Sequence, residues 1–221
     1  MLSKKEIAGL IDHSLLRPDA TYSDIEKLCH EAIEYGFHSV CVNPFFVKIA
    51  KELLKKSDVK VTTVIGFPFG MTLTEVKVYE AMNSSLLGAD ELDIVVNIGA
   101  LKSGDWDILR RDISDVIIAT RGLIHKTIIE TCYLNDDEKT KVVTIALDAG
   151  SEFIKTSTGF GLRGAQIVDV RLIKDIVGDT AGIKAAGGIK TLKTVLDMLE
   201  AGATRIGTSA GVEIMNEFEA E

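Results

Sequence analysis

Short apolar segments rich in β-branched residues alternate along the chain with longer segments of helical periodicity. Eight such segments, each bounded by turn or capping residues, are predicted to be strands. They lie at residues 10–13, 39–43, 60–65, 91–96, 126–130, 153–157, 182–186 and 205–208. Strands separated by helices pair in parallel, because each helix returns the chain to the same edge of the sheet. The chain is therefore expected to form an α/β fold with a parallel sheet.

The ends of four predicted helices indicate that the repeating units share one register. A strand is predicted to begin about three residues after each of the glycines Gly36, Gly88, Gly150 and Gly202. Glycine readily adopts the left-handed conformation that is common at helix C-termini. The residues five positions after these glycines are Cys41, Asp93, Lys155 and Gly207. A shared register places all four at one depth on one side of their strands, so the two ionisable residues among them indicate an interior site.

Eight strands with their helices in 221 residues match the length of the smaller (β/α)8 barrels, or TIM barrels. We predict one domain, residues 1–221, with a short helix before the first strand. An open doubly wound sheet is the alternative, but no G-x-G-x-x-G motif follows the first predicted strand. In TIM barrels the active site lies at the C-terminal ends of the strands. Two capping boxes, Ser23-x-x-Glu26 and Thr72-x-x-Glu75, predict helix starts.

Two predicted core strands each carry a lysine, Lys155 and Lys184. Burial disfavours an ammonium group, and a second ammonium nearby disfavours it again, which would leave one amine neutral and nucleophilic. Schiff-base chemistry requires such an amine. The two lysines are one strand–helix unit apart, so we expect them on adjacent strands. Alternatively, either lysine extends to the surface or neutralises a buried carboxylate.

Two acidic residues also lie in apolar strand segments. Asp93, in segment 91–97, is placed to move protons between a substrate, water and a lysine amine. The alternative is that Asp93 is only a counter-ion that holds a lysine in place. Asp12 is a second candidate partner for a lysine. We expect the neighbouring His13 to form hydrogen bonds, since a lone histidine is weak evidence for catalysis or metal binding.

Glycine-containing loops follow the seventh and eighth predicted strands, where barrels often bind phosphate. These loops contain Gly187-Gly188 and the segment 207–211. Glycine lets the backbone approach an anion, and N–H groups at the start of a helix favour negative charge. Tight packing is the alternative explanation for these small residues.

The charge balance narrows the classes of partner. With 25 basic and 33 acidic residues the net charge is −8, which argues against nucleic acid and anionic membranes as partners. Charged residues begin at Lys4, before any apolar run forms, and no segment approaches the roughly 18 apolar residues of a membrane helix, so we expect a cytoplasmic protein. The three cysteines are widely spaced and are expected to be reduced thiols, not disulfides or zinc ligands.

Several segments resemble the deoxyribose-phosphate aldolases, a family of class I aldolases. The resemblance extends over nearly the whole chain, and the two lysine-centred segments together are its most specific part. The matching segments are 11–16 (IDHSLL), 39–44 (SVCVNP), 64–68 (VIGFP), 93–99 (DIVVNIG), 130–132 (ETC), 155–160 (KTSTGF) and 184–188 (KAAGG).

This resemblance implies reversible cleavage of 2-deoxy-D-ribose 5-phosphate to acetaldehyde and D-glyceraldehyde 3-phosphate, without a metal or an organic cofactor. It implies that Lys155 forms the imine, that Lys184 activates this amine and assists proton transfer, and that Asp93 moves protons. The implied phosphate-binding and supporting residues are Gly159, Gly187, Gly188, Gly207 and Ser209, with Asp12 and Thr156 in support. Members of the family are commonly homodimers or homotetramers, and the same is expected here.

The chain departs from the family pattern in a few places. Leu162-Arg163 replaces smaller residues, and Arg17 stands where a lysine is common. The last residues, 218–221, lack the C-terminal tyrosine of some relatives. These differences bear on substrate affinity and proton-transfer efficiency more than on the reaction. Two other functions remain open on the residues alone: another Schiff-base aldolase that acts on a phosphosugar, and a non-catalytic barrel that binds phosphosugars.

Overall fold

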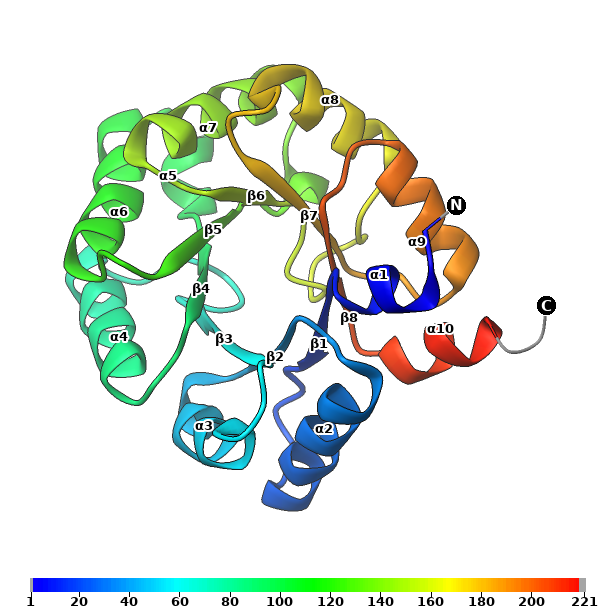
Figure 1. The fold of residues 1–221 in the computed structure, drawn as a ribbon. Coiled ribbons are helices and arrows are strands. Elements are labelled where there is room, and N and C mark those ends of the chain that lie inside the picture. Colours follow the sequence, from blue (N-terminus) through cyan, green and yellow to red (C-terminus); the bar gives the residue numbers. More distant parts are fainter. Residues whose placement is uncertain (1, 219–221) are drawn as a thin grey trace.

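Eight parallel strands form a closed barrel in the computed structural model, which describes residues 2–218. Each strand pairs with its neighbours in sequence, and β8 pairs with β1 to close the barrel (Figure 1). The strands are β1 (Ile11–Leu15), β2 (Ser39–Val42), β3 (Lys60–Ile65), β4 (Glu91–Val95), β5 (Ile124–Ile128), β6 (Phe153–Lys155), β7 (Gly182–Ala186) and β8 (Arg205–Thr208). The predicted TIM barrel is confirmed.

Helices surround the barrel as an outer ring (Figure 1). The short α1 precedes β1, as predicted. The helices are α1 (Lys4–Ala8), α2 (Tyr22–Tyr35), α3 (Val47–Leu54), α4 (Thr74–Leu86), α5 (Ile98–Lys102), α6 (Trp106–Ala119), α7 (Asp136–Ala149), α8 (Ile167–Val177), α9 (Leu192–Glu200) and α10 (Gly211–Glu217), with 3₁₀ turns at η1 (Pro44–Phe46) and η2 (Thr131–Tyr133).

Glycines end helices as predicted, whereas both predicted capping boxes are wrong. Gly36 ends α2 with φ 71° and Gly150 ends α7 with φ 100°, and both are left-handed. Helix α2 begins at a capping box in which Thr21 and Asp24 exchange hydrogen bonds, so the N–H groups of the first turn are satisfied before the predicted start. Helix α4 begins beyond Thr72, without a side-chain cap.

Strand boundaries differ from the predicted ones where the chain turns toward a neighbouring loop. Strand β5 was expected at 126–130 but ends at Ile128, because Glu130 adopts a left-handed backbone with φ 41° that cannot continue a strand. Strand β6 ends at Lys155, before the predicted end at residue 157. The next residue, Thr156, uses its hydroxyl to bind the backbone of Ala186 on β7.

Interior side chains of alternate strands form layers across the barrel. The strand register puts one interior residue from each even-numbered strand in one layer; these are Cys41, Asp93, Lys155 and Gly207. The prediction that these four share a depth and a side is therefore confirmed. The adjacent layer, nearer the N-terminal ends, comes from the odd-numbered strands and consists of Asp12, Thr62, Lys126 and Lys184. The apolar core lies outside the strands, against the helices, and includes Val40, Leu92 and Ile154.

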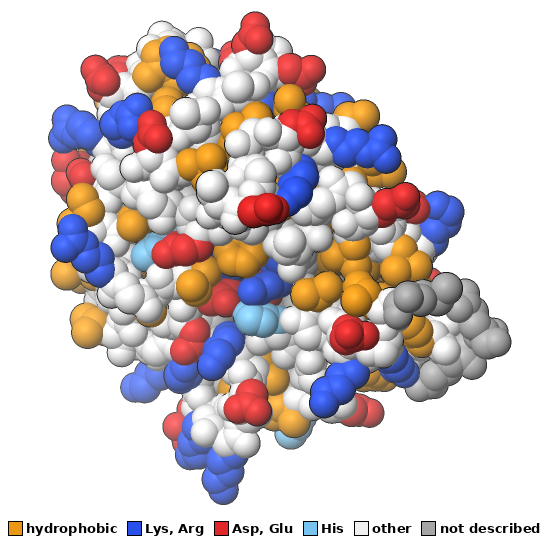
Figure 2. Space-filling view, turned by 45° about the horizontal axis from the view of Figure 1, so that its top comes forward, with side chains coloured by type: hydrophobic (Ala, Val, Ile, Leu, Met, Phe, Trp, Pro, Cys, Tyr) orange, Lys and Arg blue, Asp and Glu red, His pale blue; other side chains and the backbone are white. Residues whose placement is uncertain are grey.

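The surface in view carries charges of both signs. Figure 2 shows Lys and Arg side chains interspersed with Asp and Glu side chains and with apolar ones on this face. Among residues 2–218, no helix is long and apolar enough to cross a membrane.

Candidate active site

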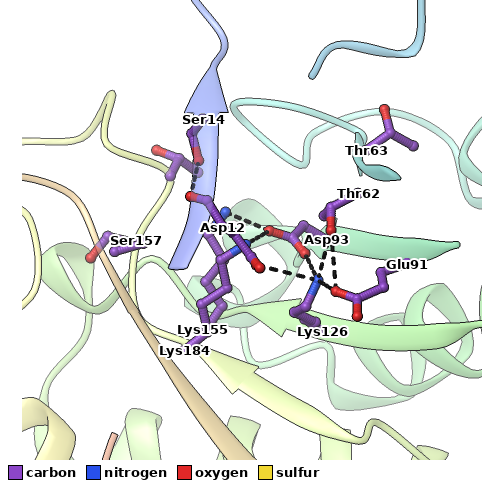
Figure 3. Close-up of polar contacts among 12 residues, drawn as sticks. Asp12, Ser14, Thr62, Thr63, Glu91, Asp93, Lys126, Lys155, Ser157 and Lys184 are labelled. Atoms are coloured by element: carbon purple, nitrogen blue, oxygen red, sulfur yellow. Dashed lines mark hydrogen bonds and ion pairs between the residues drawn. The ribbon is translucent and has the colours of Figure 1, made fainter. Parts of the chain in front are cut away.

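The barrel interior holds a cluster of buried charged side chains, most of which are drawn in Figure 3. Three carboxylates face four basic groups: Asp12, Glu91 and Asp93 face Lys126, Lys155, Lys184 and Arg205. Burying a charge is costly unless it is paired, and each of these groups has an oppositely charged partner. Because basic groups outnumber acids by one, one of them can be neutral while the cluster stays balanced.

Asp93 lies at the centre of three lysines. Its Oδ2 accepts hydrogen bonds from Lys155 Nζ at 2.7 Å and from Lys184 Nζ at 2.8 Å, and its Oδ1 accepts one from Lys126 Nζ at 2.8 Å. Burial by itself raises the pKa of Asp93, but the three lysines outweigh burial and hold this pKa well below its usual range. The structure thus brings together the three residues predicted to be catalytic, with Asp93 as a carboxylate.

Lys184 is fully buried and pairs with two carboxylates, Asp12 Oδ2 at 2.5 Å and Asp93 Oδ2 at 2.8 Å. Burial lowers the pKa of Lys184, but the two carboxylates outweigh burial and hold the pKa above its usual value. Burial likewise raises the pKa of Asp12, but Lys184, Lys126 and Arg205 bring it far below its usual value. Lys184 is therefore a fixed ammonium group and not the neutral amine that Schiff-base chemistry requires.

A cavity of about 470 Å³ opens at the C-terminal ends of β1, β6, β7 and β8. Lys155 lines this cavity, whereas Lys126 and Lys184 are fully buried and do not. Every residue predicted to bind phosphate also lines it, namely Gly159, Gly187, Gly188, Gly207 and Ser209. Of these three interior lysines, Lys155 is the one that a ligand in the cavity can reach.

Glycines in the cavity wall have backbone conformations that other residues avoid. Gly159, Gly187 and Gly188 have φ angles of 88°, 90° and 76°. A Cβ atom at Gly187 would lie 2.9 Å from the Cα atom of Gly164, in the loop that follows β6. Glycine at position 187 is thus required both by its conformation and by the close approach of two loops.

Sequence reasoning missed part of the charged cluster. Lys126 Nζ lies 2.6 Å from Glu91 Oε2, and Arg205 Nη1 lies 3.2 Å from the same oxygen. Burial raises the pKa of Glu91, but a hydrogen bond from His38 and the charge of Lys126 outweigh burial and lower the pKa to about 2. The period of two along a strand is the signal that would have found Glu91 and Arg205, because each lies two positions before a predicted interior residue.

Two basic residues that were not predicted as ligands, Arg17 and Lys190, also line the cavity. Arg17 is held in place by ion pairs to Asp19 at 2.8 Å and Asp24 at 2.7 Å. Each follows the end of a strand by a few residues, where side chains of a barrel reach the active site. Lys190 adds positive charge to the cavity wall, whereas the charge of Arg17 is already balanced by its two carboxylate partners.

Three buried or half-buried residues could share a metal ion by distance. Ligand atoms of Asp12, His38 and Glu91 lie within 4.8 Å of one another. The two carboxylates already pair with Lys126 and Arg205, whose positive charges repel a metal cation. The donor set therefore fits an ion-pair network better than a metal site.

The remaining predicted residues lie beside the cluster. Thr156 Oγ1 donates to the carbonyl oxygen of Ala186 at 3.2 Å and accepts from its N–H at 3.1 Å, which ties the loop after β6 to β7. His13 Nε2 lies 2.8 Å from Glu31 Oε2, so its predicted hydrogen-bonding role is confirmed. The predicted lack of a C-terminal tyrosine concerns the end of the chain, where residues 219–221 lie outside the described residues.

An amine at the edge of a cavity, bound to a carboxylate and backed by a fixed ammonium group, suits covalent catalysis through an imine. In a TIM barrel with glycine loops at the same cavity, this arrangement is that of a class I aldolase.

Comparison with known proteins gives the family. The sequence model of the DeoC/LacD family aldolase matches residues 7–217. The chain is 58% identical over 214 residues to a deoxyribose-phosphate aldolase of Thermococcus gammatolerans, covering 95% of each chain. It is 56% identical over 218 residues to one of Thermococcus kodakarensis, covering 97% of each. A solved tetrameric deoxyribose phosphate aldolase of Aeropyrum pernix superposes with a TM-score of 0.92 at 33% identity, covering 99% of this chain and 93% of the other. The chain belongs to the DeoC/LacD aldolase family, and the predicted resemblance is confirmed.

Proposed function

We propose that this chain catalyses the reversible cleavage of 2-deoxy-D-ribose 5-phosphate to acetaldehyde and D-glyceraldehyde 3-phosphate, through an imine on Lys155. One observation carries the choice of lysine: Lys155 lines the open cavity, while Lys184 is fully buried and held as an ammonium group. The choice of substrate is supported by relatives that are 56 and 58% identical to this chain and are named deoxyribose-phosphate aldolases.

The proposed reaction proceeds through an imine and then an enamine on Lys155. Lys155 Nζ adds to the C1 aldehyde of the open-chain sugar, and loss of water gives the imine. The protonated imine accepts the electron pair of the C2–C3 bond as this bond breaks, and the C3 hydroxyl loses its proton as the new carbonyl forms. D-Glyceraldehyde 3-phosphate leaves, and an enamine remains on Lys155. Protonation of the enamine carbon and hydrolysis then release acetaldehyde and restore the amine.

Asp93 and Lys184 are the groups placed to move these protons. Asp93 Oδ2 lies 2.7 Å from Lys155 Nζ and 2.8 Å from Lys184 Nζ, so one carboxylate oxygen joins the two amines. Asp93 is a carboxylate and can only accept a proton at first, whereas Lys184 can donate one. Asp12 holds Lys184 in this position by its ion pair.

The phosphate group of the substrate is assigned to the glycine loops at the same cavity. Gly159, Gly187 and Gly188 have left-handed backbones that bring N–H groups near the cavity without side chains in the way. Gly207 and Ser209 complete this wall, and Lys190 adds positive charge. Lys155 and the phosphate loops therefore line one cavity, as a phosphorylated sugar requires.

Borohydride trapping tests the assignment. Native chain treated with acetaldehyde and sodium borohydride is expected to carry an ethyl group on Lys155, located by digestion and mass spectrometry. The Lys155→Ala variant should lose this adduct and the cleavage activity, while Lys193→Ala, on the surface of α9, should keep both. A folded native chain with neither adduct nor cleavage would refute the mechanism and favour a binding barrel.

We further propose that the chain assembles as a homodimer or homotetramer. A row of apolar side chains runs along α4 at one-turn spacing and is 46 to 83% exposed; it consists of Val76, Tyr79, Met82 and Leu86. Exposed apolar rows of this kind mark contacts with other proteins, and homodimer contacts are especially apolar. The Aeropyrum pernix relative is described as tetrameric. Light scattering should give a dimer or tetramer for native chain and a smaller species for Tyr79→Asp; a native monomer would refute this proposal.

A cytoplasmic location is proposed with this function. The cysteines at positions 29, 41 and 132 are free thiols, as expected in a reducing compartment. A phosphorylated sugar is also the expected substrate of an enzyme that acts among intracellular metabolites.

A further inference from the structure

A buried carboxylate that is bound by neutral donors lies beneath the loop that follows Lys155. Glu130 comes shortly after β5 and is 2% exposed. Within residues 2–218, the hydrogen bonds that its carboxylate accepts come from Thr158 and Cys132. Buried carboxylates are usually paired with a cation, so a buried carboxylate with neutral donors needs a structural or functional explanation.

The backbone of Glu130 is strained as well. Its φ of 41° and ψ of 68° place it in the left-handed region, and among residues 2–218 it is the one non-glycine residue with positive φ. Such strain costs free energy and persists where the surrounding structure enforces it, often at functional sites. The flanking backbone is held to the chain around Lys155: the N–H of Ile129 donates to the carbonyl of Lys155 at 3.0 Å, and the N–H of Thr131 donates to that of Thr156 at 2.9 Å.

The carboxylate of Glu130 organises the turn from Thr158 to Phe160. The backbone N–H of Thr158 donates to the two carboxylate oxygens at 3.4 and 3.3 Å, and its hydroxyl donates to Oε2. The same hydroxyl accepts the N–H of Phe160 at 3.0 Å. The N–H groups on both sides of Gly159 are thus occupied. The N–H of Gly159 has no acceptor within residues 2–218, and Gly159 lines the cavity.

The loop also lies directly on Glu130. A Cβ atom at Gly161 would lie 2.8 Å from Cys132 Sγ and 3.0 Å from Glu130 Cδ. Contacts this short leave no room for a side chain at position 161, so the loop packs on the carboxylate by its backbone. Glu130 and the turn above it therefore behave as one packed unit.

We propose that Glu130 is a positioning residue for the phosphate group of the substrate. Its carboxylate fixes the Thr158–Phe160 turn and so leaves the Gly159 N–H available to the phosphate. The proposal rests on the proposed function, because it assumes that the cavity takes a phosphorylated sugar. A negative charge near a phosphate is unfavourable by itself, so the benefit must come from the geometry that Glu130 imposes on the turn.

Two variants compared on two sugars test this role. The measured quantity is the ratio of kcat/KM for 2-deoxyribose 5-phosphate to kcat/KM for 2-deoxyribose. Both values come from one enzyme sample, so any loss of folded enzyme cancels in the ratio. Glu130→Ala removes every acceptor and should lower the ratio roughly tenfold, mainly by raising KM for the phosphorylated sugar. Glu130→Gln keeps one acceptor oxygen and should lower it less. Glu200→Gln, at an exposed glutamate at the end of α9, is the matched control and should leave the ratio unchanged.

The outcomes separate this proposal from the proposed function. An unchanged ratio in both Glu130 variants would overturn the positioning role, even if both activities fell together, because that pattern indicates a structural role alone. If the native chain cleaved neither sugar, the proposed function would fail. The positioning role would then be decided by the thermal shift that inorganic phosphate produces: native chain should shift and Glu130→Ala should not, and equal shifts would overturn the proposal.

Discussion

Replacing Asp93 by asparagine removes one negative charge from the centre of the buried cluster and nearly keeps the size of the side chain. Asp93 binds Lys126, Lys155 and Lys184, at distances of 2.7 to 2.8 Å. In the native chain four basic groups face three carboxylates, whereas in the variant they would face two. The excess of basic groups in the barrel therefore rises from one to two.

The folded variant can lower its energy by releasing a proton from one lysine. At an effective dielectric constant near 20, an ammonium and a carboxylate 2.8 Å apart attract by about 6 kcal/mol. Discharging a lysine with an ordinary pKa of about 10.4 at pH 7 costs about 4.6 kcal/mol. Because the lost attraction exceeds this cost, we expect one lysine of the variant to be neutral when folded. The variant should then be less stable than the native chain by roughly 4 to 5 kcal/mol at pH 7.

The neutral lysine should change how the free energy of unfolding of the variant depends on pH. The unfolded variant binds the lysine proton that the folded variant lacks, so its free energy of unfolding should rise by about 1.4 kcal/mol per pH unit above neutral pH. In the native chain, burial lowers the pKa values of Lys126 and Lys184, but their carboxylate partners outweigh burial and raise these values above the ordinary one. The stability that these two lysines contribute is therefore present below the unfolded pKa of about 10.4 and is lost only above it, so in the native chain these two lysines produce no such rise.

Urea unfolding at about pH 7, 8 and 9 measures this difference between native chain and Asp93→Asn. Asp175→Asn, at an exposed aspartate on α8, is the matched control and should follow the native chain. If the native and Asp93→Asn free energies stayed parallel across this range, no lysine would have discharged and the electrostatic reasoning would be wrong. Cleavage activity of Asp93→Asn should fall at least roughly 100-fold, as expected when a proton-transfer group is lost.

Burial raises the pKa values of Asp12 and Asp93, but neighbouring cations outweigh burial and hold both values below the usual one. Acid should therefore destabilise the native chain. The contribution of these two aspartates is present above the unfolded pKa of about 3.9 and is lost as pH falls through the folded values, so a urea midpoint that stayed constant below about pH 4 would contradict it. Lys77→Met should cost roughly 3 to 5 kcal/mol, because it leaves Asp112 buried without its cation, and adding Asp112→Leu should recover most of this loss in thermal unfolding; equal losses in single and double variants would disprove it. Gly187→Ala should raise KM for the phosphorylated sugar and destabilise the fold by about 1 to 3 kcal/mol, because φ is 90° there; native-like values of both would exclude the proposed strain.

The fold was predictable because its signals are local and repeat. Each unit shows an apolar strand and a helix, and left-handed glycines at Gly36 and Gly150 end two of the helices as expected. The boundaries were less predictable, because they depend on contacts with other parts of the chain. Strand β5 ends at Ile128, two residues before the left-handed Glu130. The conformation of Glu130 is tied to the loop after β6, and no residue pattern near position 130 shows that contact.

The site was predictable in part. Asp93 and Lys155 share an offset from a helix-ending glycine, which places them in one layer of the barrel before any coordinates are known. Lys126 lies in the adjacent layer on β5, whose unit does not share that offset, and so the partner of Asp93 was missed. The available signal was that Lys126, a charged residue, lies in a predicted strand segment.

The sequence by itself determined the barrel, the family and the side of the strands on which Asp93 and Lys155 lie, because periodicity and glycine placement are properties of neighbouring residues. The family resemblance implied Lys155 as the reacting amine, but the residue pattern by itself did not determine which lysine is available to react, because both lie in similar short strands. The tertiary structure distinguished them: Asp12, more than 140 residues before Lys155 in the sequence, holds Lys184 as a buried ammonium group, while Lys155 faces the cavity. Burial and charge at one atom depend on distances between segments far apart in the chain, and only folding sets those distances.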